Sequence, residues 1–238
     1  MLTPILSAAG LAAAATGGYA YAAMWPASQI FGRTVVAGTN PNEFALTYDD
    51  GPNEPETAML LELLAEHKVH ATFFVIGQFA RQRPEIVRAL AAGGHTVGNH
   101  SMTHPKLLFC RHQRVHDELA GCNAAIEDAL GAPVRLMRCP HGMRRPDVLR
   151  TARALGLTPV QWNVTAYDWQ PIGADRIVAN VERGIELNRR RGRSSNILLH
   201  DGGQAGIGQD RKATVEATRR LLETYAASVR FVTPQAWA

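Results

Sequence analysis

Cysteine is scarce in this chain, and its spacing argues against a disulfide framework. Only 3 cysteines, Cys110, Cys122 and Cys139, occur in 238 residues, and no two of them form a C-x-x-C pair. Cys110 and Cys122 fall in one predicted helix, whose rise between them is roughly 18 Å, too far for a disulfide. We therefore expect three free thiols, which say little about the cellular compartment.

Nucleotide-binding and nucleic-acid-binding motifs are also missing. No G-x-G-x-x-G or Walker sequence follows the first predicted strand, which disfavours a nucleotide-binding fold. The formal net charge is +4, and much of the excess comes from an arginine run at residues 189–193. Such a run is typical of a solvated helix end, with weak attraction to an anionic polymer or phospholipid as the alternative. We expect no nucleic-acid partner, because no reader motif accompanies the charge.

Charged side chains are absent from residues 2–32. Residues 5–25 are apolar or small and long enough to span a bilayer, but their Ala, Gly and Thr content makes insertion marginal. Three interpretations stay open: a membrane anchor, a signal peptide with an A-x-A site at residues 20–22, or a helix packed loosely on the domain. We divide the chain into this N-terminal hydrophobic segment, residues 1–35, and one domain, residues 36–238. The segment predicts a membrane-anchored or exported bacterial cell-envelope protein.

Strands and helices alternate from residue 43 onward, and apolar residues make up 46% of the chain, enough for a large core. The predicted strands are 43–48, 70–76, 95–99, 134–139, 158–164, 196–200 and 230–233. The predicted helices are 55–67, 84–92, 111–130, 146–155, 174–190 and 210–225. This alternation predicts an α/β fold with parallel strands and right-handed crossovers. We interpret it as a distorted, incomplete (β/α)7 barrel, with an open doubly wound sheet as the alternative.

Polar side chains lie where the predicted strands end. The carboxyl ends of parallel strands share the edge at which α/β sites form, so we expect these residues to meet there. They are Asp49, Asp50, His100, Arg138, Asp168 and His200.

The residues that follow two of these strands suggest a metal ion. His100 and His104 are four residues apart, and on a turn of helix they would share a face and bind one ion. Asp49 and Asp50 would point to opposite faces of a regular strand, but Gly51-Pro52 breaks the pleat, so both can approach one pocket. One carboxylate would then be the third ligand and the other a base. Two histidines and a carboxylate leave a coordination position for water, as hydrolysis requires.

A second histidine pair, His112 and His116, has the same spacing. It lies in a basic helix beside Arg111 and Arg114, with no loop opening nearby. We interpret this pair as solvated surface.

Five motifs in order resemble the polysaccharide deacetylase family, the NodB homology domain of carbohydrate esterase family 4. Thr47-Tyr48-Asp49-Asp50-Gly51 is similar to its T-F-D-D-G, and His100-Ser-Met-Thr-His104 to its H-[ST]-x-x-H. The other three are Arg138-Cys-Pro-His-Gly142 for R-x-P-[YF]-G, Tyr167-Asp168-Trp169 for the end of D-x-x-D-W, and Leu198-Leu199-His200 for L-x-H. The resemblance covers about residues 40–234.

The resemblance implies a hydrolase that removes N-acetyl or O-acetyl groups from a carbohydrate, such as chitin oligomers, peptidoglycan or a related glycan. It implies one divalent metal ion, usually zinc, as cofactor. By this resemblance, Asp50, His100 and His104 are the metal ligands, Asp49 is the base and His200 is the acid. Arg138 would hold Asp49, and Asp168 would orient His200. Trp169 and Leu198 would line the acetyl pocket, and the backbone N–H of His141 would stabilise the oxyanion.

The chain departs from the family pattern at three positions. Thr165 stands where the family has the first Asp of D-x-x-D-W, His141 replaces the usual Tyr or Phe, and Cys139 replaces a frequent Pro. The alternatives to the deacetylase are a carbohydrate-binding relative with reduced catalysis, a deacylase of a lipid-linked amino sugar, and a structural membrane-attached protein.

Overall fold

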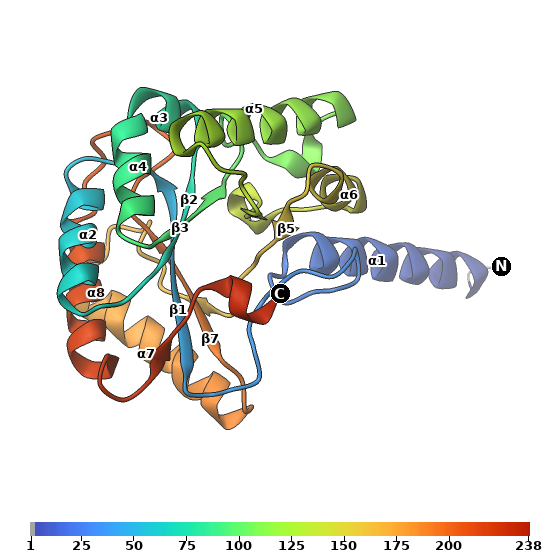
Figure 1. Ribbon diagram of the computed structural model, residues 1–238. Coiled ribbons are helices and arrows are strands. Elements are labelled where there is room, and N and C mark those ends of the chain that lie inside the picture. The colour runs from blue at the N-terminus through green and yellow to red at the C-terminus, as the bar shows by residue number, and fades with distance from the viewer. Residues whose placement is uncertain (1–2) are drawn as a thin grey trace.

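The computed structural model describes residues 3–238 and is built around one curled sheet (Figure 1). The recorded pairings between its strands are parallel. The strands are β1 (Glu43–Gly51), β2 (Thr72–Val75), β3 (Thr96–Asn99), β4 (Leu136–Met137), β5 (Thr158–Pro159), β6 (Val164–Thr165), β7 (Ser195–His200) and β8 (Arg230–Phe231).

The sheet is an open barrel. Its strands run in the order β5-β4-β3-β2-β1-β7-β6, and β8 pairs with the start of β1. This is the cyclic order of a barrel that is open between β5 and β6, whereas a doubly wound sheet reverses its direction at a switch point. The predicted incomplete (β/α)7 barrel is confirmed, and the doubly wound alternative is wrong.

The predicted strand 158–164 is wrong in one respect, because it is two strands. β5 pairs with β4 and β6 pairs with β7, so one stretch of chain supplies the last strand on each side of the opening. Between them, Asn163 Oδ1 accepts a hydrogen bond from the backbone N–H of Asn196 at 2.8 Å. Trp162 Nε1 donates to Thr165 Oγ1 at 2.9 Å. The Asn163 side chain takes the place of a backbone acceptor here, and the strand is interrupted, which an apolar pattern alone does not reveal.

The helices cover the outside of the barrel (Figure 1). The six predicted helices are confirmed to within two residues at each end, and the short α3 was not predicted. Gly131, at a φ of 66°, closes α5 as the left-handed residue that a helix end favours. The helices of the barrel are α2 (Glu56–Glu66), α3 (Gly77–Gln82), α4 (Pro84–Ala92), α5 (His112–Leu130), α6 (Pro146–Ala154), α7 (Ala174–Arg190) and α8 (Lys212–Tyr225).

β1 and β7 are neighbouring strands inside the sheet and are buried along their whole lengths. They pair from Phe44 and Ser195 to Asp49 and His200. Burial on both faces is typical of a parallel strand between a barrel interior and its helices. The packing therefore fixes the backbone that ends in Asp49, Asp50 and His200.

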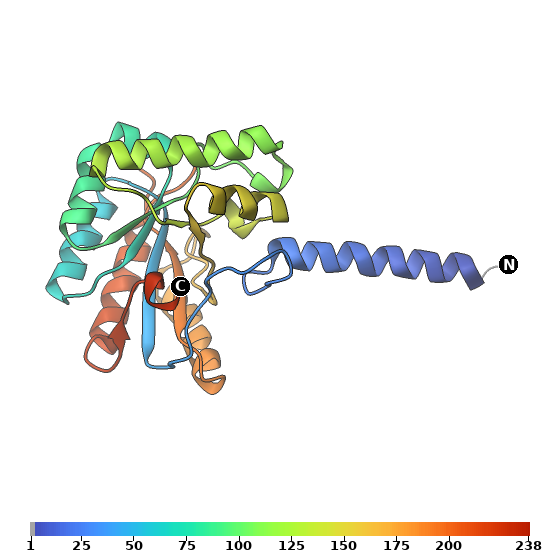
Figure 2. The same ribbon diagram turned by 45° about the vertical axis from the view of Figure 1, so that its right-hand side comes forward.

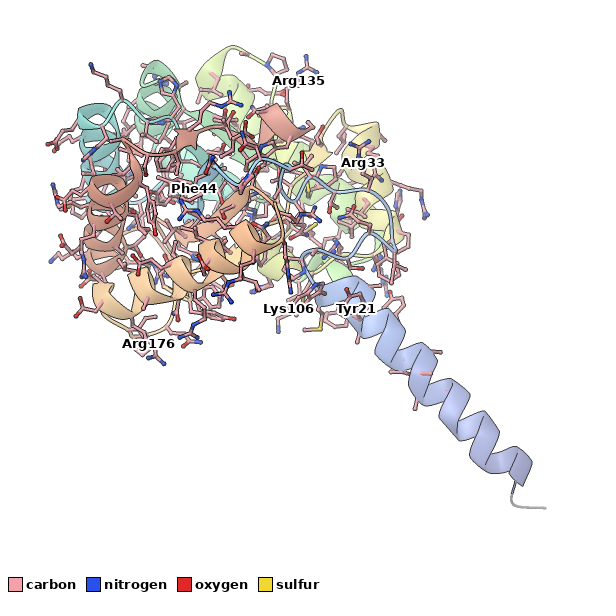
Figure 3. The ribbon with its side chains drawn as sticks, turned by 90° about the horizontal axis from the view of Figure 1, so that it is seen from below. Tyr21, Arg33, Phe44, Lys106, Arg135 and Arg176 are labelled. Atoms are coloured by element: carbon pink, nitrogen blue, oxygen red, sulfur yellow. The ribbon has the colours of Figure 1, made fainter. Side chains whose placement is uncertain are left out.

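The N-terminal helix α1 (Thr3–Met24) projects away from the barrel (Figure 2). Its last turn contacts the domain: Ala22 and Ala23 are buried, and the guanidinium of Arg144 donates to the carbonyls of Trp25 at 2.7 Å and Ser28 at 2.8 Å. Seen from below, most of the helix lies clear of the domain beyond Tyr21 (Figure 3). The interpretation as a helix packed loosely on the domain therefore holds only for the last turn of α1.

In the part of the chain that the structure describes, no helix combines the length and apolarity needed to cross a membrane. The membrane anchor expected for residues 5–25 is thus not supported. Met1 and Leu2, which belong to the predicted segment 1–35, lie outside the described residues.

Candidate active site

The carboxyl edge of the sheet opens into a cavity of about 480 Å³. The strand ends bring the predicted polar residues together there, with Arg138 and Asp168 buried directly behind the wall. The residues that line the cavity are Asp49, Asp50, His100, His104, His141, Gly142, Trp162, Trp169, Leu198, His200, Gly203, Gln204, Ala205, Gln209 and Arg211.

Asp49 and Asp50 both face this cavity because β1 is irregular at its end. Asp50 adopts a φ of 72°, and the register of β1 against β2 shifts between Asp49 and Gly51. The break expected at Gly51-Pro52 therefore begins at Asp50 itself. A non-glycine residue in the left-handed region is strained, and such strain gathers at functional sites.

His100 and His104 lie in a loop, so the expected helical turn is wrong. Ser101 and His104 have φ values of 64° and 58°, which fold the loop back on itself. The backbone N–H of Ser101 donates to Asn99 Oδ1 at 2.8 Å, and that of His104 donates to Ser101 Oγ at 3.1 Å. Two left-handed residues, in place of a helical turn, thus bring the two imidazoles together, with ring centroids 4.9 Å apart.

Asp50, His100 and His104 form a group that could hold a metal ion. Each offers one ligand atom, and these atoms all lie within 4.8 Å of one another. Asp50 Oδ1 lies 3.4 Å from His100 Nε2 and 3.1 Å from His104 Nε2. Each imidazole is oriented by an oxygen at its other nitrogen: Nδ1 of His100 meets the carbonyl of Arg138 at 2.9 Å, and Nδ1 of His104 meets Gln204 Oε1 at 2.8 Å.

The charge state of this group suits a cation. Burial raises the pKa of the Asp50 carboxyl, but the adjacent His100 and His104 outweigh it and hold that pKa well below its usual range. Asp50 Oδ1 is buried and has no hydrogen-bond partner among the described residues. A buried, ionised oxygen without a partner is costly, and a metal ion between the three ligand atoms would satisfy it. The donor set of two imidazoles and one carboxylate therefore fits a divalent metal.

Asp49 is held by a buried arginine. Arg138 Nη1 donates to Asp49 Oδ1 and to Thr47 Oγ1, both at 2.8 Å. Its guanidinium lies 4.3 Å from the ring centroid of Phe74. The other Asp49 oxygen, Oδ2, lies 3.7 Å from His100 Nε2. Asp49 therefore presents one oxygen to Arg138 and the other toward the candidate metal position.

His200 and Asp168 form a second buried pair, at the end of β7 beside the end of β1. Asp168 Oδ1 accepts from His200 Nδ1 at 2.8 Å, and Oδ2 accepts from the backbone N–H of His200 at 2.7 Å. Burial alone would lower the pKa of His200, but Asp168 outweighs it and raises that pKa to about 9. The imidazole is therefore protonated at neutral pH, with Nε2 free to donate.

The remaining predicted wall residues also lie at the cavity. Trp169 is 44% exposed, and its ring lies 5.3 Å from that of His200 between centroids; Leu198 is buried. His141 has a φ of 57°, and its ring centroid lies 4.6 Å from that of His104. Burial is the main cause that lowers the pKa of His141 to about 4, so this side chain is neutral around pH 7.

Some cavity residues were not predicted. Trp162 was hidden inside the supposed strand 158–164, and its hydrogen bond to Thr165 gives the departure at that position a local role. Gln204, Gln209 and Arg211 come from the glycine-rich loop after β7. No motif pointed to this loop, although Gly202-Gly203, two residues after the predicted site residue His200, was a usable signal.

The histidines set aside in the sequence do lie on the surface. The His112 side chain is 69% exposed and contacts Asp147, and His116 is also exposed. The three cysteines are free thiols, as predicted.

One cavity of this parallel barrel thus combines a carboxylate–imidazole group that could hold a metal, a buried Asp–Arg pair and a protonated histidine. This combination is typical of a hydrolase site. The family model for polysaccharide deacetylase matches residues 37–160. A chitooligosaccharide deacetylase of Sinorhizobium fredii is 45% identical over 82% of this chain and 86% of its own length. The chain belongs to the polysaccharide deacetylase family.

Two solved structures share the fold. A peptidoglycan N-acetylglucosamine deacetylase, in complex with 4-naphthalen-1-yl-N-oxidanyl-benzamide, superposes with a TM-score of 0.75 at 30% identity, covering 86% of this chain and 91% of that one. A family 4 carbohydrate esterase from Streptomyces lividans, in complex with acetate, gives a TM-score of 0.69 at 31% identity, covering 82% of this chain and 95% of that one.

Proposed function

We propose that this protein is a zinc-dependent deacetylase that removes N-acetyl groups from chitooligosaccharides. The observation that carries the proposal is the convergence of Asp50, His100 and His104 with Asp49 and His200 on one cavity. Such a site would place a metal, a base and an acid around one small space, as amide hydrolysis needs.

Asp50, His100 and His104 would hold the metal, and two imidazoles with one carboxylate suit zinc. When bound, the ion supplies Lewis-acid polarisation of the acetyl carbonyl and lowers the pKa of water. Asp49 is the base, because its Oδ2 faces the ligand group while Arg138 holds Oδ1 in place. It takes the proton of the attacking water.

His200 is the acid in this proposal. Its Nδ1 is committed to Asp168, so Nε2 carries the proton that the departing amine nitrogen requires. Trp169 and Leu198 form the wall against which the acetyl methyl packs. The backbone N–H of His141, in its left-handed conformation beside His104, is the donor for the developing oxyanion.

The substrate assignment is supported by the relatives. Beyond the S. fredii protein, a chitooligosaccharide deacetylase of a Bradyrhizobium strain is 43% identical over 74% of this chain. The S. lividans structure holds acetate, the product that deacetylation releases. Peptidoglycan is the second candidate substrate, because the superposed N-acetylglucosamine deacetylase acts on it.

We also propose that residues 36–238 form the catalytic domain, since they supply every cavity-lining residue. Residues 1–35 are then a separate N-terminal segment that directs export. Fractionation of cells that produce the full chain checks this: deacetylase outside the cytoplasm supports export, and deacetylase confined to the cytoplasm contradicts it.

The test of the activity is an incubation of the zinc-loaded protein with an N-acetylglucosamine pentamer and, separately, with peptidoglycan fragments. Mass spectrometry counts the acetyl groups lost, and an acetate assay confirms the product. Loss of acetyl groups from the pentamer supports the proposal. Activity on peptidoglycan alone would move the assignment to the second candidate, and activity on neither would refute the deacetylase.

A further inference from the structure

One side chain that contacts a candidate metal ligand comes from a glycine-rich loop. Gln204 belongs to the loop between β7 and α8, a stretch that contains Gly202, Gly203, Gly206 and Gly208. Its side-chain oxygen Oε1 lies 2.8 Å from Nδ1 of His104. Gln204 also lines the cavity, so it contacts both the candidate metal ligand and the space in which substrate would bind.

This contact selects one form of the His104 imidazole. An amide oxygen only accepts hydrogen bonds, so Nδ1 must be the donor. Nε2 then keeps its lone pair, and it is Nε2 that lies 3.1 Å from Asp50 Oδ1 within the ligand group. The hydrogen bond from His104 to Gln204 therefore presents the atom that a metal needs and holds the ring in the matching orientation.

His100 provides an internal comparison. Its Nδ1 is held by the backbone carbonyl of Arg138 at 2.9 Å. That carbonyl belongs to the barrel and no side-chain substitution removes it. The corresponding oxygen on His104 belongs to a side chain, so the two imidazoles differ in how they can be perturbed.

The loop that carries Gln204 is tied at both ends to the barrel. The Asn53 amide nitrogen donates to the carbonyls of Asp201 at 3.0 Å and Gln209 at 2.8 Å, while its oxygen accepts from the backbone N–H of Gly208 at 2.6 Å. Arg211 Nε donates to the carbonyl of Gly202 at 2.6 Å. A Cβ at Gly202 would collide with the Asp50 carbonyl, so the start of the loop lies directly against the strand that bears the ligand.

We propose that Gln204 is a positioning residue for the metal, acting through the His104 ring; this inference rests on the metal site of the proposed function. Hydrogen-bond partners behind a metal ligand typically change metal affinity by about 10- to 100-fold when removed. Gln204 does not touch the metal position itself in this assignment. Its loss weakens metal binding without removing a ligand.

The experiment measures the zinc dissociation constant by competition with a chelator for the full chain and three variants. Gln204→Ala removes the acceptor and is expected to weaken zinc binding by about 10- to 100-fold. Gln204→Glu keeps an acceptor oxygen at the same distance along the side chain and is expected to restore affinity to the wild-type value or tighter. Gln209→Ala is the matched control, because it removes a glutamine from the same loop and cavity that does not contact His104.

A second readout separates positioning from a general disturbance of the loop. Thermal unfolding of the zinc-free proteins should be the same for Gln204→Ala and Gln209→Ala, while their zinc affinities differ. Wild-type zinc affinity in Gln204→Ala, or an equal loss in both alanine variants, would overturn the role of Gln204 while the metal site stands. If the wild-type chain binds no zinc, the metal site of the proposed function fails as well.

Discussion

Arg138 Nη1 donates to Asp49 Oδ1 at 2.8 Å, and both side chains are almost completely buried, at 0% and 5% exposure. This pairing explains how a carboxylate can lie beside the ionised Asp50 in a protein interior. An uncompensated buried charge is strongly destabilising, so each member of the pair depends on the other.

Arg138→Met is therefore expected to lower the free energy of unfolding by about 3–5 kcal/mol, because it leaves the Asp49 carboxylate without its cation. It should also lower kcat, since Asp49 loses the contact that orients it. Urea unfolding and steady-state kinetics measure the two effects. Arg144→Met is the control: Arg144 is also buried, but it donates to the backbone carbonyls of Gly142, Trp25 and Ser28 and not to a carboxylate. A comparable loss of kcat in that variant would show that the effect is not specific to Asp49.

The two adjacent aspartates have different proposed roles, which substitution separates. Asp49→Asn should retain zinc and lose about 10²-fold or more in kcat, because it removes a base and not a ligand. Asp50→Asn should lose zinc, because it replaces the charged carboxylate, whose ligand oxygen lies within 4.8 Å of both imidazole nitrogens, with a neutral amide. Metal content and kcat are measured on the same samples. Loss of zinc from Asp49→Asn with retention in Asp50→Asn would require the roles to be exchanged.

The raised pKa of His200 predicts the alkaline limb of the pH–rate profile. Asp168 raises this pKa to about 9, and the proposed acid must be protonated, so activity should fall as the pH rises through about 9. Asp168→Asn removes the carboxylate and should move that fall to lower pH. Profiles of kcat/KM against pH check the shift. An unchanged alkaline limb in Asp168→Asn would remove this pair from the proton transfer.

His200 should matter more for an amide than for an activated ester. An amine leaving group needs a proton, whereas an aryl oxide departs without one, so His200→Ala should impair deacetylation of an N-acetyl sugar more than of an aryl acetate. Rates on the two substrates, compared in the same variant, give the ratio. Equal losses on both would indicate that His200 only packs beneath the cavity.

The sequence was sufficient for the barrel and for the edge at which the site lies. Alternation of strands and helices predicted the order of elements, and polar residues after the apolar runs predicted where Asp49, His100 and His200 meet. It was insufficient for backbone conformations that depend on tertiary contacts. The left-handed residues Asp50 and His104 are held by the surrounding loops, so spacing alone suggested a regular strand end and a helical turn instead.

Two further features could not be predicted for related reasons. The division of residues 158–165 into β5 and β6 depends on the hydrogen bond between Asn163 and Asn196, which are 33 positions apart, and on the side-chain bond from Trp162 to Thr165. An apolar pattern reveals neither bond. The contact of Gln204 with His104 joins residues 100 positions apart, and a loop without a motif offers no reason to expect it.

The central claim is that a metal held by Asp50, His100 and His104 is required to remove acetyl groups from a chitooligosaccharide. The direct measurement is acetate release from an N-acetylglucosamine pentamer. The wild-type protein is assayed as purified, after a chelator has removed its metal, and again after zinc is added back. The variants His104→Ala and His112→Ala are assayed in parallel. We predict that chelation abolishes release, that zinc restores it, that His104→Ala is inactive and zinc-free, and that His112→Ala behaves as wild type. Undiminished acetate release from the chelated protein or from His104→Ala would contradict the account.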